Sequence, residues 1–262
     1  MTLRSYPGMT DRLRAACAWR AALETIGEFE AEGRVYPMFV VRMGEPGPGK
    51  IGVMIAAGIH GDEPAGVEAA LEFIEKRAGD EELLARAAFV IFPCNNPTGW
   101  ERDTRENSQG IDLNRQFLAR GAAAEVRSIM RALRGRCFDL VFEMHEDIDS
   151  PGLYLYEIAE DSDYYVGEEI IRRAEAMGCP INLNDEIEGL PAHGGLIRRG
   201  ISIDKFRKTR LPQAIYTYRT CGGHIITLEP PASRLPLEER VRIVLMALDT
   251  ALESTVRRTP GR

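Results

Sequence analysis

The chain has 262 residues, 44% of them hydrophobic, which suits one large α/β domain over residues 1–262 with a sizeable core. Its formal net charge is −7 and its acidic and basic residues are mixed, so we expect no nucleic-acid partner. Neither the apolar core of a signal peptide nor the ~20 apolar residues of a membrane span is present, which predicts a cytoplasmic location and no membrane partner. The 5 cysteines are scattered without metal-type spacing and are predicted to be reduced thiols.

Apolar runs alternate with amphipathic helical stretches along the chain. Strands are predicted at residues 35–42, 51–57, 89–92, 140–144, 153–158 and 225–228. Helices are predicted at residues 64–76, 126–133, 164–177 and 236–257. Residues 95–116 are predicted to form a long polar loop, and the Gly-, Arg- and Pro-rich residues 182–221 receive no assignment. The alternation favours a sheet sandwiched between helices.

Polar residues follow four of the predicted buried strands. They are His60, Asn95, His145 and Glu229, each just after a strand or at its end. Ligands bind at the carboxyl ends of strands in open α/β sheets, so these four side chains are expected to converge in one crevice.

His60 and Glu63 have the spacing of a metal-binding pair across a strand-to-helix turn. Zinc takes nitrogen and oxygen ligands, and a catalytic site needs a third protein ligand, for which His145 is the natural candidate. The alternative is a helix-start pair with a capping role, because a lone His-x-x-Glu arises often by chance. His145 alone could equally be a hydrogen-bonded histidine at a strand end.

The predicted loop contains Asn96-Pro97-Thr98-Gly99-Trp100, then Arg105, then Asp112-Leu113-Asn114-Arg115. Together with the His-x-x-Glu before it and His145 and Glu229 after it, the chain resembles the zinc carboxypeptidase family over residues 60–229. The stretch 105–115 is most similar to the murein-peptide amidase and cytosolic carboxypeptidase branches. The resemblance implies a three-layer α/β/α sandwich with a mixed, mostly parallel central sheet and a Zn²⁺ cofactor.

The resemblance implies that His60, Glu63 and His145 bind the metal. It also implies that Asp112 accepts a hydrogen bond from the first ligand histidine, which would fix the ring and raise its basicity. The alternative for Asp112 is an Asx-turn residue after Gly110.

Substrate contacts follow from the same resemblance. Asn114 and Arg115 match the pair that holds a substrate carboxylate, a task suited to the planar guanidinium fork. Arg105 matches the arginine that stabilises the oxyanion, with Arg102 as a competing neighbour. The alternative for Arg115 is a solvated loop arginine.

Glu229 matches the general base, which takes a proton from the attacking water and passes it to the leaving amine. Its alternative is a strand-end carboxylate paired with a surface arginine. A tyrosine that covers the substrate in many family members is assigned to Tyr218 rather than Tyr216, although both could be packing residues.

The sequence departs from the family after His145, where Glu146, Asp147 and Asp149 replace small or hydroxyl residues. They are predicted to form a solvated loop; the alternatives are a contact with a cationic substrate group or a second metal. The basic segment 190–219 is likewise predicted to be a solvated charged loop; the alternatives are a flexible flap or a lid over an acidic substrate.

Three functions remain open. The favoured one is a zinc carboxypeptidase or peptide amidase, and the Asn-Pro-x-Gly-Trp turn and the position of Arg105 favour it. The second is an N-acyl amino acid deacylase resembling succinylglutamate desuccinylase and aspartoacylase. The third is a non-catalytic, metal-stabilised binding domain. Either enzyme would act on a small peptide or acylated amino acid with a free carboxylate, and two histidines with one glutamate also suit Co, Mn or Ni.

Overall fold

The computed structural model describes residues 4–18, 20–198 and 209–259. Its centre is an eight-stranded sheet in the order β1-β2-β4-β3-β5-β10-β6-β9. These strands are β1 (Ala22–Ala31), β2 (Arg34–Met43), β3 (Ile51–Ala57), β4 (Ala87–Phe92), β5 (Leu140–Met144), β6 (Tyr154–Ile158), β9 (Leu196–Ile197) and β10 (His224–Glu229). A separate two-stranded ribbon consists of β7 (Glu186–Ile187) and β8 (Leu190–Pro191).

The middle of the sheet is parallel and its flanks are mixed. Strands β4, β3, β5 and β10 pair in parallel with one another. The pairs β1–β2, β2–β4 and β10–β6 are antiparallel, and β6–β9 is parallel. Parallel neighbours end at the same edge of the sheet, so β3, β5 and β10 present their carboxyl ends together.

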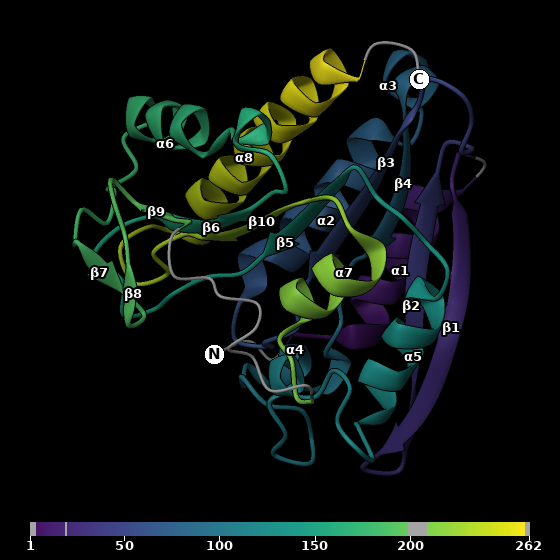
Figure 1. Ribbon diagram of the computed structural model, residues 1–262. Helices are drawn as coiled ribbons and strands as arrows, with labels where there is room; N and C mark the ends of the chain where they lie inside the picture. Colours follow the sequence, from purple (N-terminus) through teal and green to yellow (C-terminus); the bar gives the residue numbers. More distant parts are fainter. Residues whose placement is uncertain (1–3, 19, 199–208, 260–262) are drawn as a thin grey trace.

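Helices cover both faces of this sheet, which confirms the predicted three-layer architecture. One face packs against α1 (Tyr6–Cys17), α2 (Pro64–Arg77), α6 (Gly167–Ala176) and α8 (Leu237–Arg258). The other face packs against α5 (Ala124–Leu133) and α7 (Gln213–Cys221). In Figure 1, α8 and α6 lie on one side of β10 and β6, and α7 lies on the other. Short turns of helix, α3 (Glu81–Arg86), α4 (Pro97–Arg102), η1 (Leu113–Arg115) and η2 (Ser162–Tyr164), occupy the connections.

Side-chain alternation along the strands separates two cores. On β3, Val53 and Ile55 pack toward α2, whereas Met54 and Ala56 pack toward α5 and α7. A strand buried on both faces reads as a continuous apolar run, which is why this strand was predicted with its observed bounds. We call the face covered by α5 and α7 the α7 face.

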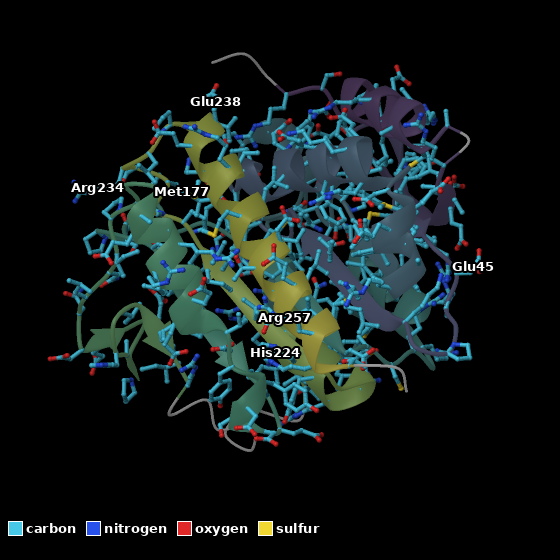
Figure 2. All side chains as sticks on the ribbon, turned by 90° about the horizontal axis from the view of Figure 1, so that it is seen from above. Glu45, Met177, His224, Arg234, Glu238 and Arg257 are labelled. Atoms are coloured by element: carbon cyan, nitrogen blue, oxygen red, sulfur yellow. The ribbon has the colours of Figure 1, made fainter. Side chains whose placement is uncertain are left out.

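The long helix α8 covers the opposite face. Its predicted apolar stripe, Val241, Val244, Leu248 and Leu252, is buried there. Figure 2 looks onto this helix, with Glu238 near its start, Arg257 near its end and α6 beside it. Since α8 and α2 close this face with apolar side chains, the polar cavity described below lies on the α7 face.

Three predictions of secondary structure were wrong or incomplete. Residues 95–116 are not a structureless loop, because they contain α4 and η1. The elements before residue 35, α1 and β1, were not predicted; β1 is an edge strand whose exposed glutamates dilute the apolar pattern. The unassigned stretch 182–221 holds β7, β8, β9 and α7, while its residues 199–208 lie outside the described part of the chain. In the described ranges, no helix has the length and apolar character needed to span a bilayer.

A buried ion-pair cluster ties β6, β10 and the start of the basic segment together. Glu157 on β6 has one carboxylate oxygen 2.9 Å from Nε2 of His224. The same oxygen accepts the Val166 N–H at 2.7 Å, and the other accepts Nε of Arg198 at 2.7 Å. The prediction of a solvated loop is therefore wrong for Arg198, whose charge is paired with a carboxylate in the interior.

Burial raises the pKa of Glu157, but the contacts with His224, Val166 and Arg198 outweigh it and leave this pKa below its usual value. We predict that Glu157→Gln lowers the free energy of unfolding by about 3 kcal/mol at pH ~7, because it removes the buried charge paired with Arg198, which keeps only its ion pair with the exposed Glu168. A lowered pKa stabilises the fold above the unfolded-state pKa of ~4.3, and this contribution is lost as pH falls through the folded-state pKa. Urea unfolding should show a smaller difference in the free energy of unfolding between the wild type and Glu157→Gln at pH ~4 than at pH ~7. The exposed Glu28→Gln on β1 is the control, and an equal deficit at both pH values would contradict the argument.

Candidate metal centre and active site

The three predicted ligands meet at the carboxyl ends of two neighbouring parallel strands. His60 follows β3, His145 follows β5, and their ring centroids lie 5.0 Å apart. The Glu63 carboxylate lies between the rings, with Oε1 2.5 Å from Nδ1 of His60 and Oε2 2.9 Å from Nδ1 of His145. One donor atom from each residue lies within 4.8 Å of the other two. The cluster therefore has the composition and the proximity of a metal site.

Glu63 does not act as a helix cap, which was the alternative explanation of the His-x-x-Glu pair. It occupies the N-cap position of α2, but its side chain makes no capping hydrogen bond. Glu146 takes that task, since its Oε2 accepts the Ala65 N–H at 2.6 Å. Glu63 is thus left to face the histidines. Two imidazole nitrogens and a carboxylate oxygen, all buried, fit a divalent metal ion of the zinc type.

Electrostatics in the cluster favour a charged Glu63. Burial raises its pKa, but His145 and His60 outweigh burial and lower the pKa to about 2. Burial lowers the pKa of His60, but Glu63 and the contact with Asp112 outweigh it and raise the pKa to about 9. A metal ion must therefore displace a proton from His60 in order to bind, and metal affinity should rise with pH.

Close backbone packing fixes the turn that carries His60 and Glu63. A Cβ atom on Gly61 would lie 1.9 Å from the carbonyl carbon of Gly99, so no other residue fits at this position. The Gly61 N–H also donates to the Arg105 carbonyl oxygen at 3.4 Å. Asn96 caps α4 by accepting the Gly99 N–H at 2.9 Å. The Asn-Pro-x-Gly turn of the sequence is therefore the support on which the metal-binding turn rests.

Asp112 forms the Asx turn and lies beside His60, whose Nε2 has no hydrogen-bond partner among the described residues. Its Oδ1 lies 3.5 Å from Nε2 of His60 and accepts the Asn114 N–H at 2.9 Å, as an Asx-turn residue does. Its Oδ2 accepts Nε and NH2 of Arg105 at 3.4 and 3.3 Å. Burial raises the pKa of Asp112, but His60 and Arg105 hold it below its usual value. The carboxylate thus connects a ligand histidine to a guanidinium.

Of the two candidate arginines, only Arg105 lies at the ligands. Its NH1 is 3.7 Å from Oε1 of Glu63, whereas Arg102 forms an ion pair with Glu32 away from the cavity. The positions of the two arginines agree with the choice of Arg105, and not Arg102, as the candidate for the oxyanion contact.

A cavity of about 1030 Å³ opens beside the ligands on the α7 face. Its described lining includes Arg105, Asn114, Arg115, Glu143, Tyr154, Tyr156, Thr227 and Glu229. Glu229 ends β10, next to His145 at the end of β5. Burial raises the pKa of Glu229 to about 8; Glu63 and Asp147 add to the rise, and His145 opposes it. A cavity of this size accommodates a small organic substrate.

Three predicted residues lie elsewhere. Tyr216 and Tyr218 are on α7 and pack in the core of the α7 face, where the Tyr216 ring lies 5.2 Å from that of Phe117. Neither is among the described residues that line the cavity, so a substrate role for Tyr218 stays a prediction that the geometry does not favour. Asn95 donates to Oε1 of Gln213 at 3.0 Å and supports the start of α7 instead of facing the crevice.

The acidic loop after His145 is less solvated than predicted. Glu146 is buried in an ion pair with Arg240, so the prediction is wrong for this residue. Asp147 is half-buried and accepts the Tyr154 hydroxyl at 2.9 Å, whereas Asp149 is exposed as predicted.

Sequence reasoning missed two tyrosines and one carboxylate in the cavity wall: Tyr154, Tyr156 and Glu143. The alternation on β6 carries a signal, because Leu155 points into the apolar core and its tyrosine neighbours must point the other way. Only the pairing of β6 with β10, which places Tyr154 opposite Glu229, shows that this other side is the cavity.

The profile of the succinylglutamate desuccinylase/aspartoacylase catalytic domain matches residues 50–229, well over half of the chain. The chain belongs to this family. The match begins at β3 and ends at Glu229, so it contains each of the site residues discussed above.

Solved structures that are named as peptidases share the fold of this chain. A candidate metallopeptidase from Shewanella amazonensis superposes with a TM-score of 0.77 at 22% identity, covering 97% of this chain and 93% of that one. A metallo-carboxypeptidase from Burkholderia cenocepacia gives 0.71 at 21% identity, covering 97% and 70%. Carboxypeptidase 2 of Trichophyton rubrum is 27% identical over 148 residues, which are 53% of this chain and 27% of the fungal protein. At these identities the structural likenesses establish the fold.

We predict that the protein binds about one divalent ion per chain at His60, Glu63 and His145. Zinc at about 100 times its Kd should add about 2.7 kcal/mol to the free energy of unfolding. His145→Ala should abolish both the binding in a calorimetric titration and the thermal stabilisation by zinc. The control is His193→Ala, an exposed histidine in the turn before β9. Unchanged zinc affinity in the His145 variant would contradict the assignment.

Proposed function

We propose that this chain is a zinc-dependent hydrolase that cleaves an amide bond next to a free carboxylate. Its membership in a family of hydrolytic catalytic domains supports the general class. The observation that carries the specific proposal is the cavity itself. There a half-buried glutamate and an arginine flank a His-Glu-His cluster, and an Asn-Arg pair lies on the wall.

Glu229 is the proposed general base. A zinc ion, when bound, lowers the pKa of a bound water and polarises a carbonyl group. The Glu229 carboxylate accepts the proton of the attacking water and later returns it to the leaving amine. Its pKa of about 8 in the buried cavity falls when positive charge is added at the ligands, because a cation favours the carboxylate form. Glu229 then accepts a proton at neutral pH.

Arg105 is proposed to stabilise the negative charge that develops on the carbonyl oxygen. Its guanidinium lines the cavity within 4 Å of the ligand cluster, as the 3.7 Å distance to Glu63 shows. Asp112 accepts two hydrogen bonds from this guanidinium, which fixes the orientation of Arg105 before a substrate binds. Fixed positive charge where negative charge develops is commonly the largest contribution to catalysis.

Asn114 and Arg115 are proposed to bind the substrate carboxylate. The Asn114 side chain is fixed because its Oδ1 accepts the Gln213 N–H at 2.8 Å, at the start of α7. The NH1 of Arg115 donates to the Asn114 carbonyl at 2.9 Å, and its guanidinium lies in the cavity wall. A planar guanidinium matches both oxygens of a carboxylate.

We predict that Glu229→Gln lowers kcat by about 10³-fold, since general acid–base catalysis contributes ~10²–10⁴-fold. Zinc affinity should change by no more than about twofold, because Glu229 is not one of the three ligands. Turnover by the zinc-loaded variant and its zinc titration are measured on the same preparation. Normal turnover would remove Glu229 from the mechanism, and lost zinc binding would make it a ligand.

The substrate separates two enzymatic functions. The family description names deacylases of N-acyl amino acids, whereas the relatives from Trichophyton and Burkholderia carry carboxypeptidase names. We favour the peptidase because the Asn-Pro-x-Gly-Trp turn and its spacing to Arg105 in the sequence favour that side. N-acetyl and N-succinyl amino acids, assayed against short peptides, decide between them.

A non-catalytic binding domain is the third function. The presence of a base, an arginine and a carboxylate-binding pair around one metal cluster argues against it. Zinc-loaded protein that hydrolyses none of the peptides or acyl amino acids would favour it over both enzymes.

A further inference from the structure

The mechanism leaves one buried carboxylate of the cavity unused. Glu143 lies on β5, two residues before His145, with a relative exposure of 2%. In the sheet register it is the partner of Thr227 on β10, which is in turn the partner of Tyr156 on β6. All three line the cavity. They form a row across three strands, which we call the Glu143 row.

The Glu143 row lies one step deeper than the reacting groups. Glu229, two residues after Thr227 on β10, is paired with Tyr154, two residues before Tyr156 on the antiparallel β6, so this pair lies about 6.7 Å nearer the edge of the sheet that carries the metal ligands. Beyond the Glu143 row, Ile225 and Ile158 are paired and also line the cavity. The floor of the cavity thus passes from the reacting groups to a carboxylate and then to apolar side chains.

Glu143 has an unsatisfied oxygen in this floor. Among the described residues, its buried Oε1 has no hydrogen-bond partner. Its Oε2 lies 3.9 Å from Nε2 of His145, which is too far for a hydrogen bond. Buried carboxylates in folded proteins are normally paired or hydrogen-bonded, so an unpaired oxygen on a residue that lines a ligand cavity indicates a partner that arrives with the ligand.

The surrounding charges favour a cationic partner. The described lining also contains Asp147, Asp149 and Glu188. Two of the lining arginines are already paired, Arg4 with Asp103 and Arg240 with Glu146. A substrate ammonium or guanidinium that reaches the floor therefore meets net negative charge and an unpaired acceptor, and charge-assisted hydrogen bonds are the stronger class.

We propose that Glu143 selects substrates in which the residue bearing the free carboxylate has a cationic side chain of the lysine or arginine type. The inference rests on the proposed function for the placement of the substrate: its carboxylate lies at Arg115, and its scissile carbonyl lies at the ligand cluster. The side chain then extends along the floor toward the Glu143 row, where its cation pairs with Oε1.

The competing explanation makes Glu143 a positioning residue for His145. In that case Glu143→Gln lowers kcat/KM for every substrate by the same factor and weakens zinc binding. If Glu143 selects the substrate, the variant changes the ratio of kcat/KM between cationic and neutral substrates and leaves the zinc affinity unchanged.

The experiment compares N-acylated dipeptides and Nα-acyl amino acids that end in lysine, arginine, norleucine or glutamine. Norleucine matches the carbon chain of lysine without its charge. The wild-type protein should prefer lysine or arginine to the neutral residues by at least about tenfold in kcat/KM, the value of one charged hydrogen bond. Glu143→Gln should abolish the preference, and Glu143→Asp should retain part of it. The control Asp149→Asn removes one negative charge at an exposed position of the lining and should leave the ratio within about twofold.

Binding of the same ligands provides a readout that does not need turnover. Calorimetric titration of zinc-loaded protein with Nα-acetyl-lysine and Nα-acetyl-norleucine should show the preference in the wild type and its loss in Glu143→Gln. If no substrate is hydrolysed but this selectivity is found, the proposed function fails and the role of Glu143 stands. Equal affinity for the two ligands, or an equal loss of selectivity in Asp149→Asn, overturns the role of Glu143. If Glu143→Gln lowers the zinc affinity but leaves the ratio of affinities for the two ligands unchanged, Glu143 positions His145 and does not select the substrate.

Discussion

The Glu63 carboxylate lies between two imidazoles that come from different parts of the chain, and the arrangement of the site depends on this contact. Parallel pairing of β3 and β5 brings His60 and His145 to one edge of the sheet. The close approach of Gly61 to Gly99 turns the chain so that Glu63 enters the gap. A buried carboxylate is costly unless it is paired, so the fold at this point is built for charge compensation by two histidines or by a metal ion.

Stability and chemistry are divided between the two faces of the sheet. The face under α2 and α8 is closed by apolar side chains. The α7 face carries polar side chains on β5, β10 and β6, and the cavity opens there. Glu146 and Arg240 connect the two regions, because Glu146 binds the N-terminus of α2 and pairs with Arg240 of α8. The helices of the apolar face thus hold the ligand turn in place, and Arg240 of α8 also lines the cavity.

Local patterns in the sequence predicted the elements whose burial is uniform along the chain, but not the contacts between distant segments. Strands β3 and β5 are buried on both faces, so their apolar runs mark their ends to the residue, and the ligands follow from those ends. The edge strand β1 is half solvated and was missed. Tyr154 was missed because its neighbour Glu229 is known only from the antiparallel pairing of β6 with β10. Burial of Glu146 also depends on a residue 94 positions away, Arg240, which no local pattern indicates.

The row structure of the cavity floor separates reaction from selection. Glu229 and Glu143 lie on neighbouring strands of one sheet face, but in successive rows, so each contacts a different part of a bound substrate. We expect a substitution in the deeper row to change which side chain fits without moving the ligand turn, because Gly99 and Asn96 hold that turn. In the proposed function the reacting row carries the chemistry, and in the proposed role of Glu143 the deeper row selects the substrate side chain.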